Sequence, residues 1–130
     1  MKELVEDIKK NEGFVGRVYK DTLGYDTIGY GTKLPLSKEE AAIILEHRLV
    51  AKIKELEQRE PFVNSLPLDK QEILAEMCYQ MGVSGVLKFA KMWSALKMFD
   101  YERAAKEMLD STWAKQTPNR AKLLSQKMQK

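Results

Sequence analysis

The sequence predicts an α+β protein that is predominantly helical, in which a long helix joins a small antiparallel sheet lobe to a helical lobe. Strand-forming residues crowd into one segment, 14–34, whereas apolar residues elsewhere recur at helical spacing. The chain has 130 residues, 44% hydrophobic and 32% charged, which is typical of a soluble globular domain. We therefore expect a single domain, 1–130, with the sheet lobe and linking helix in residues 1–60 and the helical lobe in residues 61–130.

The first expected elements are a short helix and the sheet. Apolar residues at helical spacing predict a helix over residues 2–11, which Gly13 ends. Glycines interrupt the following segment, and we expect a turn near Asp21–Gly24 between its strands. These predictions rest on Leu4, Val5 and Ile8 for the helix, and on Val15, Val18, Tyr19, Tyr25, Thr27, Ile28 and Tyr30 for the strands.

The linking helix has a clear start and a clear end. Ser37 and Glu40 form a capping box, in which each side chain bonds a free backbone amide of the first turn. Apolar residues then keep a spacing of three or four to about Arg59, and Pro61 and Pro67 mark the break to the second half. The apolar stripe consists of Ala42, Leu45, Leu49, Ile53 and Leu56.

The remainder of the chain is expected to be helical. Asp69 and Asp100 are predicted N-caps, and Gly82 is a predicted helix end. Thr117 as N-cap and Pro118 as first helical residue begin the last helix. The helices expected before it span residues 69–81, 85–98 and 101–110.

The core of the helical lobe is expected to be built from methionine and aromatic side chains. Trp113 is expected to pack between helices rather than to stack on a ligand. Cys78 lies in an apolar helical run and is expected to be buried, and as the single cysteine it allows no internal disulfide. The other predicted core residues are Met77, Met81, Phe89, Met92, Trp93, Leu96 and Phe99.

Several classes of function are excluded or left without support. No apolar run approaches the roughly 20 residues needed to span a bilayer, and the N-terminus lacks the apolar centre of a signal peptide. His47 has no partner for metal binding. Gly29-Tyr30-Gly31 lacks the third glycine of a dinucleotide loop, and the segment Asp21–Asp26 does not fit a calcium loop. The net charge is +3, and every charged side chain after Asp110 is basic. This distribution of charge is compatible with an anionic polymer as partner.

Three residues near the predicted sheet offer glycosidase chemistry. Glu12 lies at a helix end, Asp21 at a turn and Thr27 on the next strand, and folding the sheet onto the helix would bring them to one rim of a groove. Cleavage of a glycosidic bond needs one carboxyl as proton donor and one to handle water, and a hydroxyl can orient that water. On spacing alone the signal is weak, and the simpler interpretation is a solvated helix end for Glu12 and an ordinary turn residue for Asp21.

Three blocks of sequence resemble the bacteriophage lysozymes of the T4 type, glycoside hydrolase family 24. They keep the order of the family and span nearly the whole chain. The first combines Glu12-Gly13, Asp21, Thr27 and Ile28-Gly29-Tyr30-Gly31; the second is Tyr79-Gln80-Met81-Gly82 with Gly85-Val86; the third is Trp113 with Gln116-Thr117-Pro118-Asn119-Arg120-Ala121-Lys122.

The resemblance implies a lysozyme-like fold and an inverting muramidase. Glu12 would be the general acid, and Asp21 with Thr27 would position and activate water, with carboxyl groups roughly 6.5–9.5 Å apart. The implied substrate is the β-1,4-linked polymer of N-acetylmuramic acid and N-acetylglucosamine, and no cofactor or metal is implied. Arg120 would pair with Glu12 as a supporting residue, and we expect that pair to be loose because a cation opposes proton donation. The implied substrate contacts are Tyr30, Lys33, Tyr79, Gln80, Met92, Glu107, Trp113 and Asn119.

The chain departs from the pattern of the family in three places. Thr32 stands where the family often has a histidine, which puts stability in doubt more than chemistry. The segment between Leu34 and the long helix is short, so the sheet is expected to be trimmed. Met92 and Glu107 replace polar residues of the cleft wall, so the affinity for sugar is expected to differ.

Alternatives to hydrolysis remain open at this point. A non-hydrolytic peptidoglycan-binding module, a basic helical nucleic-acid binder and a lytic transglycosylase each fit part of the pattern. The favoured expectation is a monomer that acts on bacterial peptidoglycan, without nucleic acid or stable membrane association. With no export signal recognised, we expect it to wait in the host cytoplasm until it is released to the cell wall.

Overall fold

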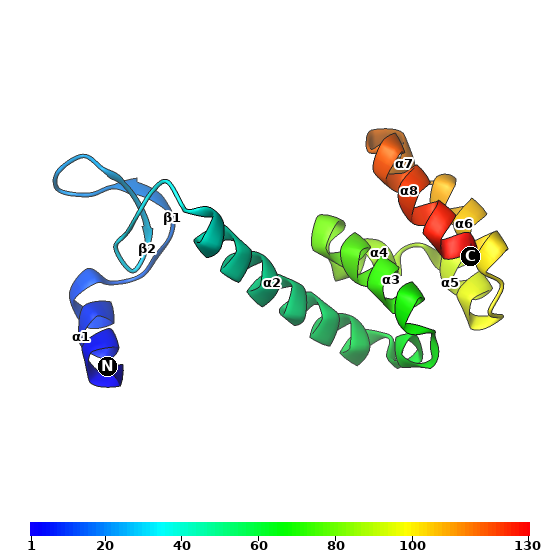
Figure 1. The fold of residues 1–130 in the computed structure, drawn as a ribbon, viewed down its shortest axis with the longest axis horizontal. Helices are drawn as coiled ribbons and strands as arrows, with labels where there is room; N and C mark the ends of the chain where they lie inside the picture. The colour runs from blue at the N-terminus through cyan, green and yellow to red at the C-terminus, as the bar shows by residue number, and fades with distance from the viewer. The chain divides into compact units, whose positions relative to one another are not determined.

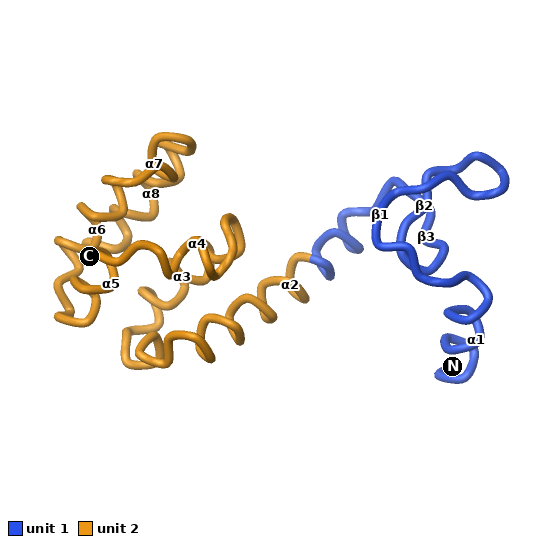
Figure 2. The backbone as a smooth tube through the Cα atoms, turned by 180° about the vertical axis from the view of Figure 1, so that it is seen from behind, with its two compact units in different colours: residues 1–44 blue, residues 45–130 orange.

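The computed structural model describes residues 1–130, with eight α-helices, one 3-10 helix and a three-stranded antiparallel sheet (Figure 1). This confirms the predicted α+β class with a helical majority. The chain divides into two compact units, Met1–Ile44 and Leu45–Lys130 (Figure 2). The division lies inside the long helix rather than at residue 60, because Leu56 in the second half of that helix is buried in the core of unit 2.

Unit 1 begins with the predicted helix and sheet. Helix α1, Lys2–Glu12, ends at Gly13, whose φ of 70° suits glycine and whose amide donates to the Lys9 carbonyl over 2.9 Å. Thr27 is the only buried residue of this unit. The strands are β1 (Val15–Lys20), β2 (Asp26–Gly29) and β3 (Thr32–Lys33), paired antiparallel in the order β1-β2-β3.

The capping box at the start of the long helix is confirmed. Glu40 Oε1 accepts from the Ser37 amide over 2.9 Å, and Ser37 Oγ accepts from the Glu40 amide over 3.1 Å. Helix α2 then runs over Lys38–Arg59. The 3-10 helix η1, Pro61–Ser65, follows, because Pro61 has no amide hydrogen with which to continue the α-helix.

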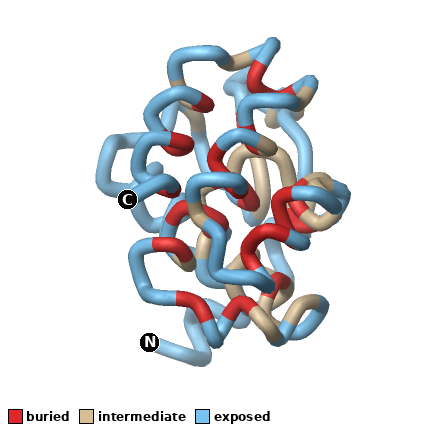
Figure 3. Tube along the Cα trace, turned by 90° about the vertical axis from the view of Figure 1, so that its right-hand side faces the viewer, coloured by how far each residue is buried: buried red, intermediate tan, exposed pale blue.

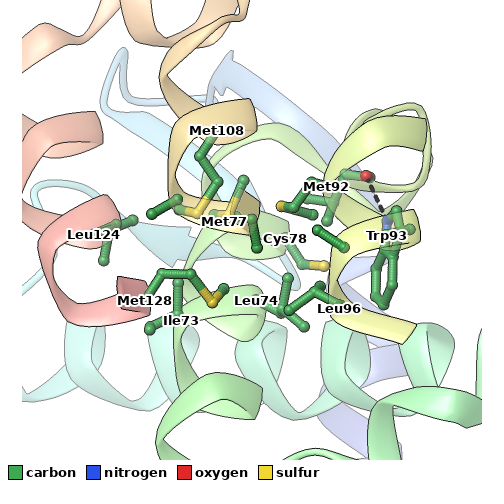
Figure 4. Close-up of a cluster of buried hydrophobic side chains, with 14 of the residues drawn as sticks. Ile73, Leu74, Met77, Cys78, Met92, Trp93, Leu96, Met108, Leu124 and Met128 are labelled. Atoms are coloured by element: carbon green, nitrogen blue, oxygen red, sulfur yellow. Dashed lines mark hydrogen bonds between the residues drawn. The ribbon is translucent and has the colours of Figure 1, made fainter. Parts of the chain in front are cut away.

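Unit 2 encloses the hydrophobic core of the protein. Buried and exposed residues alternate along its helices (Figure 3). Side chains of α3, α5, α6 and α8 point toward one another, among them the predicted core residues Met77, Cys78, Met92 and Leu96 (Figure 4). The helices of this unit after η1 are α3 (Leu68–Met81), α4 (Val83–Leu87), α5 (Ala90–Lys97), α6 (Tyr101–Leu109), α7 (Thr112–Gln116) and α8 (Pro118–Gln129).

One predicted helix cap is wrong, and a second is confirmed in position only. Helix α3 begins one residue before Asp69, whose carboxylate makes no cap hydrogen bond and instead pairs with Lys70 Nζ at 3.1 Å. Thr117 is the N-cap of α8 and Pro118 its first residue, as predicted, but the Thr117 hydroxyl makes no cap hydrogen bond and donates to the Trp113 carbonyl over 3.1 Å. The Asp100 cap is confirmed, since its carboxylate accepts from the Arg103 amide.

The single helix predicted over residues 85–98 is also wrong, because the chain breaks at Phe89. The Trp93 indole donates to the Val86 carbonyl over 3.0 Å, and that carbonyl would accept from Ala90 in a continuous helix (Figure 4). The Ala90 amide instead donates a hydrogen bond to the Lys88 carbonyl. Helices α4 and α5 are the result.

Most of the predicted core side chains are buried, and one of them is exposed. Phe99 is 54% exposed and has a φ of 55°, because the chain reverses there between α5 and α6. Its ring contacts Phe62, with 5.9 Å between the ring centroids. Met81 and Phe89 pack against the core and are partly buried.

Candidate active site

Glu12 is the last residue of α1, and its carboxyl lies against the turn between β2 and β3. A Cβ built on Gly31 would stand 2.5 Å from Glu12 Oε2 and 2.7 Å from Cδ. Gly31 also has a φ of 73°. Only glycine therefore leaves room for the Glu12 carboxyl while holding this backbone conformation. No group of unit 1 donates a hydrogen bond to that carboxyl.

Asp21 directly follows β1 and is held by the turn that the sequence predicts. Its Oδ1 accepts from the amides of Leu23 and Tyr25 at 2.9 and 2.8 Å, and its Oδ2 accepts from Lys33 Nζ. The Lys33 hydrogen bond, followed by the Tyr25 amide, lowers the pKa of Asp21 below its ordinary value of 3.8, although partial burial opposes this. Asp21 is therefore a carboxylate over the whole neutral and mildly acidic range.

Lys33 brings the two acids into one electrostatic group. It lies on β3, opposite Thr27 of the central strand. The hydrogen bond to Asp21 is the main cause that raises the pKa of Lys33, and the negative charge of Glu12 adds to the same effect. Glu12 thus lies against Gly31 and Asp21 is paired with Lys33, two residues further along the same β2–β3 segment.

Thr27 lies at the centre of this region and is completely buried. Its neighbours across the sheet are Tyr19 on β1 and Lys33 on β3. Its hydroxyl donates to the Tyr25 carbonyl over 2.8 Å, so the Oγ1 lone pairs are left to accept a hydrogen bond. That arrangement suits a group that receives a proton of a bound water, and its role with water stays a prediction.

Tyr30 lies beside this group and carries an aromatic partner that the sequence did not suggest. Tyr30 is 44% exposed, and its ring centroid is 5.4 Å from that of Phe14. Lys9 Nζ lies 5.6 Å from the Tyr30 centroid. Phe14 follows Glu12 and Gly13 directly, so an exposed aromatic next to the acid was the available signal.

Unit 2 contains a pocket of about 710 Å³. Four of the predicted substrate contacts line it: Gln80, Met92, Glu107 and Trp113. Trp113 is 7% exposed, donates from its indole to Gln80 Oε1 over 2.9 Å and meets Phe89 edge-on. It therefore packs between helices, as expected, with one side at the pocket. Met92 is 1% exposed and contributes only to the floor.

Sequence reasoning missed other side chains of this pocket. They carry both signs of charge, with Lys88 and Lys91 around the start of α5 and Asp110 at the end of α6. The break of the helix at Phe89 places the two lysines, and no sequence pattern predicted that break. Further lining residues are Met81, Gly85, Phe89, Ala90, Ser111, Thr112 and Gln116.

The remaining predicted residues lie outside the pocket. Tyr79 is 39% exposed and Asn119 is exposed. Arg120 Nε donates to Glu76 Oε2 over 3.1 Å within unit 2. The pairing of Arg120 with Glu12 stays a prediction.

No cluster of three or more histidine, cysteine or acidic side chains is arranged to hold a metal ion. None of the helices combines the length and the apolar character that crossing a membrane requires.

Comparison with known proteins identifies the family. Residues 9–129 match the family model described as phage lysozyme. The chain is 31% identical to "Probable T4-type lysozyme 1" of Dictyostelium discoideum, over 88% of this chain and 86% of that protein. It is 30% identical to "Probable T4-type lysozyme 2" of the same organism, over 91% of this chain and 88% of that protein.

A third relative is a larger protein. The chain is 32% identical to the "Pre-baseplate central spike protein Gp5" of Enterobacteria phage T4, over 91% of this chain but only 26% of that protein. The alignment with the first Dictyostelium protein is 146 positions long, more than the 130 residues here, so that relative has residues without a counterpart. The predicted resemblance is confirmed, and the chain belongs to the phage lysozyme family of glycoside hydrolases.

Proposed function

We propose that this protein is a muramidase that hydrolyses the β-1,4 bond between N-acetylmuramic acid and N-acetylglucosamine in bacterial peptidoglycan, with inversion, and thereby lyses cells. Family membership supports the general activity. The observation that carries the assignment of residues is the unequal surroundings of two neighbouring carboxyls. Asp21 accepts hydrogen bonds from two amides and a lysine, whereas Glu12 accepts none within unit 1.

These different surroundings suit the two carboxyls to different catalytic roles, one as base and one as acid. Asp21 is held as a carboxylate and serves as the base that takes a proton from water. Glu12 has its oxygens free and gives a proton to the leaving sugar oxygen. Thr27 accepts a hydrogen bond from the attacking water through its free lone pairs. Water adds at the face of the sugar opposite the leaving group, so the product has inverted configuration.

The pocket of unit 2 is proposed to bind the polymer. Its volume of about 710 Å³ lies in the usual range for ligand sites, and it combines aromatic walls with polar side chains. Gln80, Glu107 and Trp113 are the predicted contacts that reach it. Tyr30 and Lys33 beside the acids, and Tyr79 and Asn119 on the surface of unit 2, are proposed as outer contacts.

The deciding experiment is the Glu12→Gln variant. It keeps the size of the side chain and removes the transferable proton, so we expect clearing of permeabilised Gram-negative cells to be lost while the circular dichroism spectrum is unchanged. Glu3→Gln is the matched control, because Glu3 is an exposed glutamate in the first turn of the same helix. Undiminished clearing by Glu12→Gln would end the proposal.

The products distinguish the remaining mechanisms. Digestion in heavy-oxygen water followed by mass spectrometry should show the label at the new reducing end. Anhydro-sugars without label would instead indicate a lytic transglycosylase. Sedimentation with peptidoglycan and no released sugar would indicate a binding module. Proton NMR of the first product formed should show the α-anomer if the reaction inverts a β-linkage.

A further inference from the structure

We propose that Lys33 is a positioning residue for the cleavage reaction: its ammonium fixes the Asp21 carboxylate and balances the negative charge of the acid pair throughout the reaction. The sequence suggested only a sugar contact for this residue. The inference rests on the proposed function, because it requires Asp21 to act as the base.

The hydrogen bonds of Asp21 show which of its oxygens can act. Oδ1 accepts from the amides of Leu23 and Tyr25, and these two bonds use its two lone-pair positions. Oδ2 accepts only from Lys33 and keeps one position free. The oxygen that can take a proton from water is therefore Oδ2, the oxygen that Lys33 holds.

The sheet holds Lys33 in place for this task. Lys33 pairs with Thr27 across β2 and β3, and the next residue, Leu34, donates from its amide to the Asp26 carbonyl over 2.9 Å. Backbone pairing with the central strand thus holds both Lys33 and the residue that follows it. Lys33 and Asp21 are 12 positions apart in the sequence, and their side chains meet only in the folded sheet. The Asp21 side chain is only 14% exposed.

The positive charge of Lys33 interacts with both acids. The hydrogen bond to Asp21, followed by the negative charges of Asp21 and Glu12, raises the pKa of Lys33. Lys20, the other lysine of the sheet with a carboxylate partner, is occupied with Asp26 at 2.7 Å. Lys33 is therefore the one cation of unit 1 that is paired with the base.

The proton transfers of the reaction show why a cation is useful beside Asp21. Before cleavage Glu12 is protonated, Asp21 is ionised and Lys33 is charged, so the three groups sum to zero. During cleavage the leaving sugar oxygen takes the Glu12 proton, water bonds to the anomeric carbon, and Asp21 takes the proton of that water. Glu12 is then ionised and Asp21 neutral, so the sum is again zero. A cation that is paired with Asp21, and on which the charge of Glu12 also acts, thus faces one negative charge at the start and at the end.

Three variants test the inference. Lys33→Met removes the charge and keeps much of the chain length, Lys33→Arg keeps the charge, and Lys20→Met removes the sheet lysine that does not touch Asp21. Because the Lys33 side chain is 55% exposed, we expect all three variants to fold. Lys33→Gln replaces the methionine variant if an apolar side chain disturbs the sheet.

The first measurement does not depend on activity. Carbon NMR of the Asp21 carboxyl is followed against pH in a Glu12→Gln background. Adding Lys33→Met should shift the titration of Asp21 to higher pH, whereas Lys33→Arg and Lys20→Met should leave it near its starting position. An Asp21 titration that does not move in Lys33→Met overturns the inference, whatever the enzyme activity.

The second measurement is the pH dependence of kcat/KM in proteins that keep Glu12. In Lys33→Met the fall of activity on the acid side should move to higher pH, and Lys33→Arg should restore the original position. A raised KM at every pH with an unmoved acid limb would show that Lys33 only contacts sugar, and would overturn the inference. Full activity of Glu12→Gln or Asp21→Asn would instead remove the proposed function, which the NMR titration does not test.

Discussion

Gly31→Ala should inactivate the enzyme by displacing Glu12. The new Cβ would lie 2.5 Å from Glu12 Oε2, and ordinary van der Waals contact begins at 3.4 Å, so the carboxyl must move by about 0.9 Å. A misplacement of about 1 Å in an active site can cost roughly 100-fold in rate. The stability cost of moving the end of a flexible glutamate is small. We therefore expect a loss of about 100-fold in kcat/KM.

Gly29→Ala is the matched control for this variant. Gly29 has a φ of 71°, almost the same as the 73° of Gly31, but a Cβ there meets nothing within 4 Å. Both variants place alanine in the left-handed region, which costs about 1–2 kcal/mol. They should therefore lose similar amounts of unfolding free energy, while only Gly31→Ala loses most of its activity.

Two assays check the comparison. Urea denaturation followed by circular dichroism gives the stability of each variant, and reducing-sugar release from purified peptidoglycan gives kcat/KM below the midpoint of unfolding. Equal activities of the two variants at equal stability would refute the reasoning. The carboxyl of Glu12 would then tolerate displacement, and its contact with Gly31 would have no part in catalysis.

Three further predictions concern stability and reactivity. Lys70 is 2% exposed and donates to the Lys127 carbonyl near the end of α8 over 3.0 Å, so Lys70→Met should lower the unfolding free energy by roughly 1–3 kcal/mol in urea titrations. Burial raises the pKa of Cys78 to about 11, so a thiol reagent should label it at mildly alkaline pH only after unfolding by urea. Hydrogen bonds from Ser37 lower the pKa of Glu40 below 4.5 in the folded protein, so its stabilising effect is present above pH 4.5 and is lost as the pH falls further. Glu40→Gln should therefore flatten the acid side of the stability curve.

Each of these three has an outcome that contradicts it. Unchanged stability of Lys70→Met would mean that the buried ammonium contributes nothing net. Rapid labelling of Cys78 in the native protein would mean that the core opens readily at α3. An acid stability curve of Glu40→Gln that matches the parent would mean that the capping box does not depend on the charge of the glutamate.

Features set by neighbours in sequence could be predicted well. The Ser37 and Glu40 cap, the Asp100 cap and the helix end at Gly13 each depend on bonds between residues three or four apart. The turn at Asp21 is equally local, since its carboxylate bonds amides two and four positions later. These contacts form within one turn of chain, so the pattern of residue types is enough to find them.

Features that depend on contacts across the fold were missed or wrong. The helix predicted over residues 85–98 breaks because the Trp93 indole occupies the Val86 carbonyl, and burial in the core favours that arrangement. The pocket residues Lys88 and Lys91 follow from this break. The ion pair of Lys33 with Asp21 joins β3 to the turn after β1, and these come together only when both strands pair with β2.

The sequence by itself determined the class of fold, the family and the identity of the candidate acids, because these follow from periodicity, local caps and motifs whose order is kept along the chain. Only the tertiary structure decided which cation stands beside Asp21, how closely Gly31 confines Glu12, and which side chains surround the pocket of unit 2. Those features are distances between residues far apart in the chain, and they exist only after burial of apolar side chains and pairing of strands have set the backbone in space.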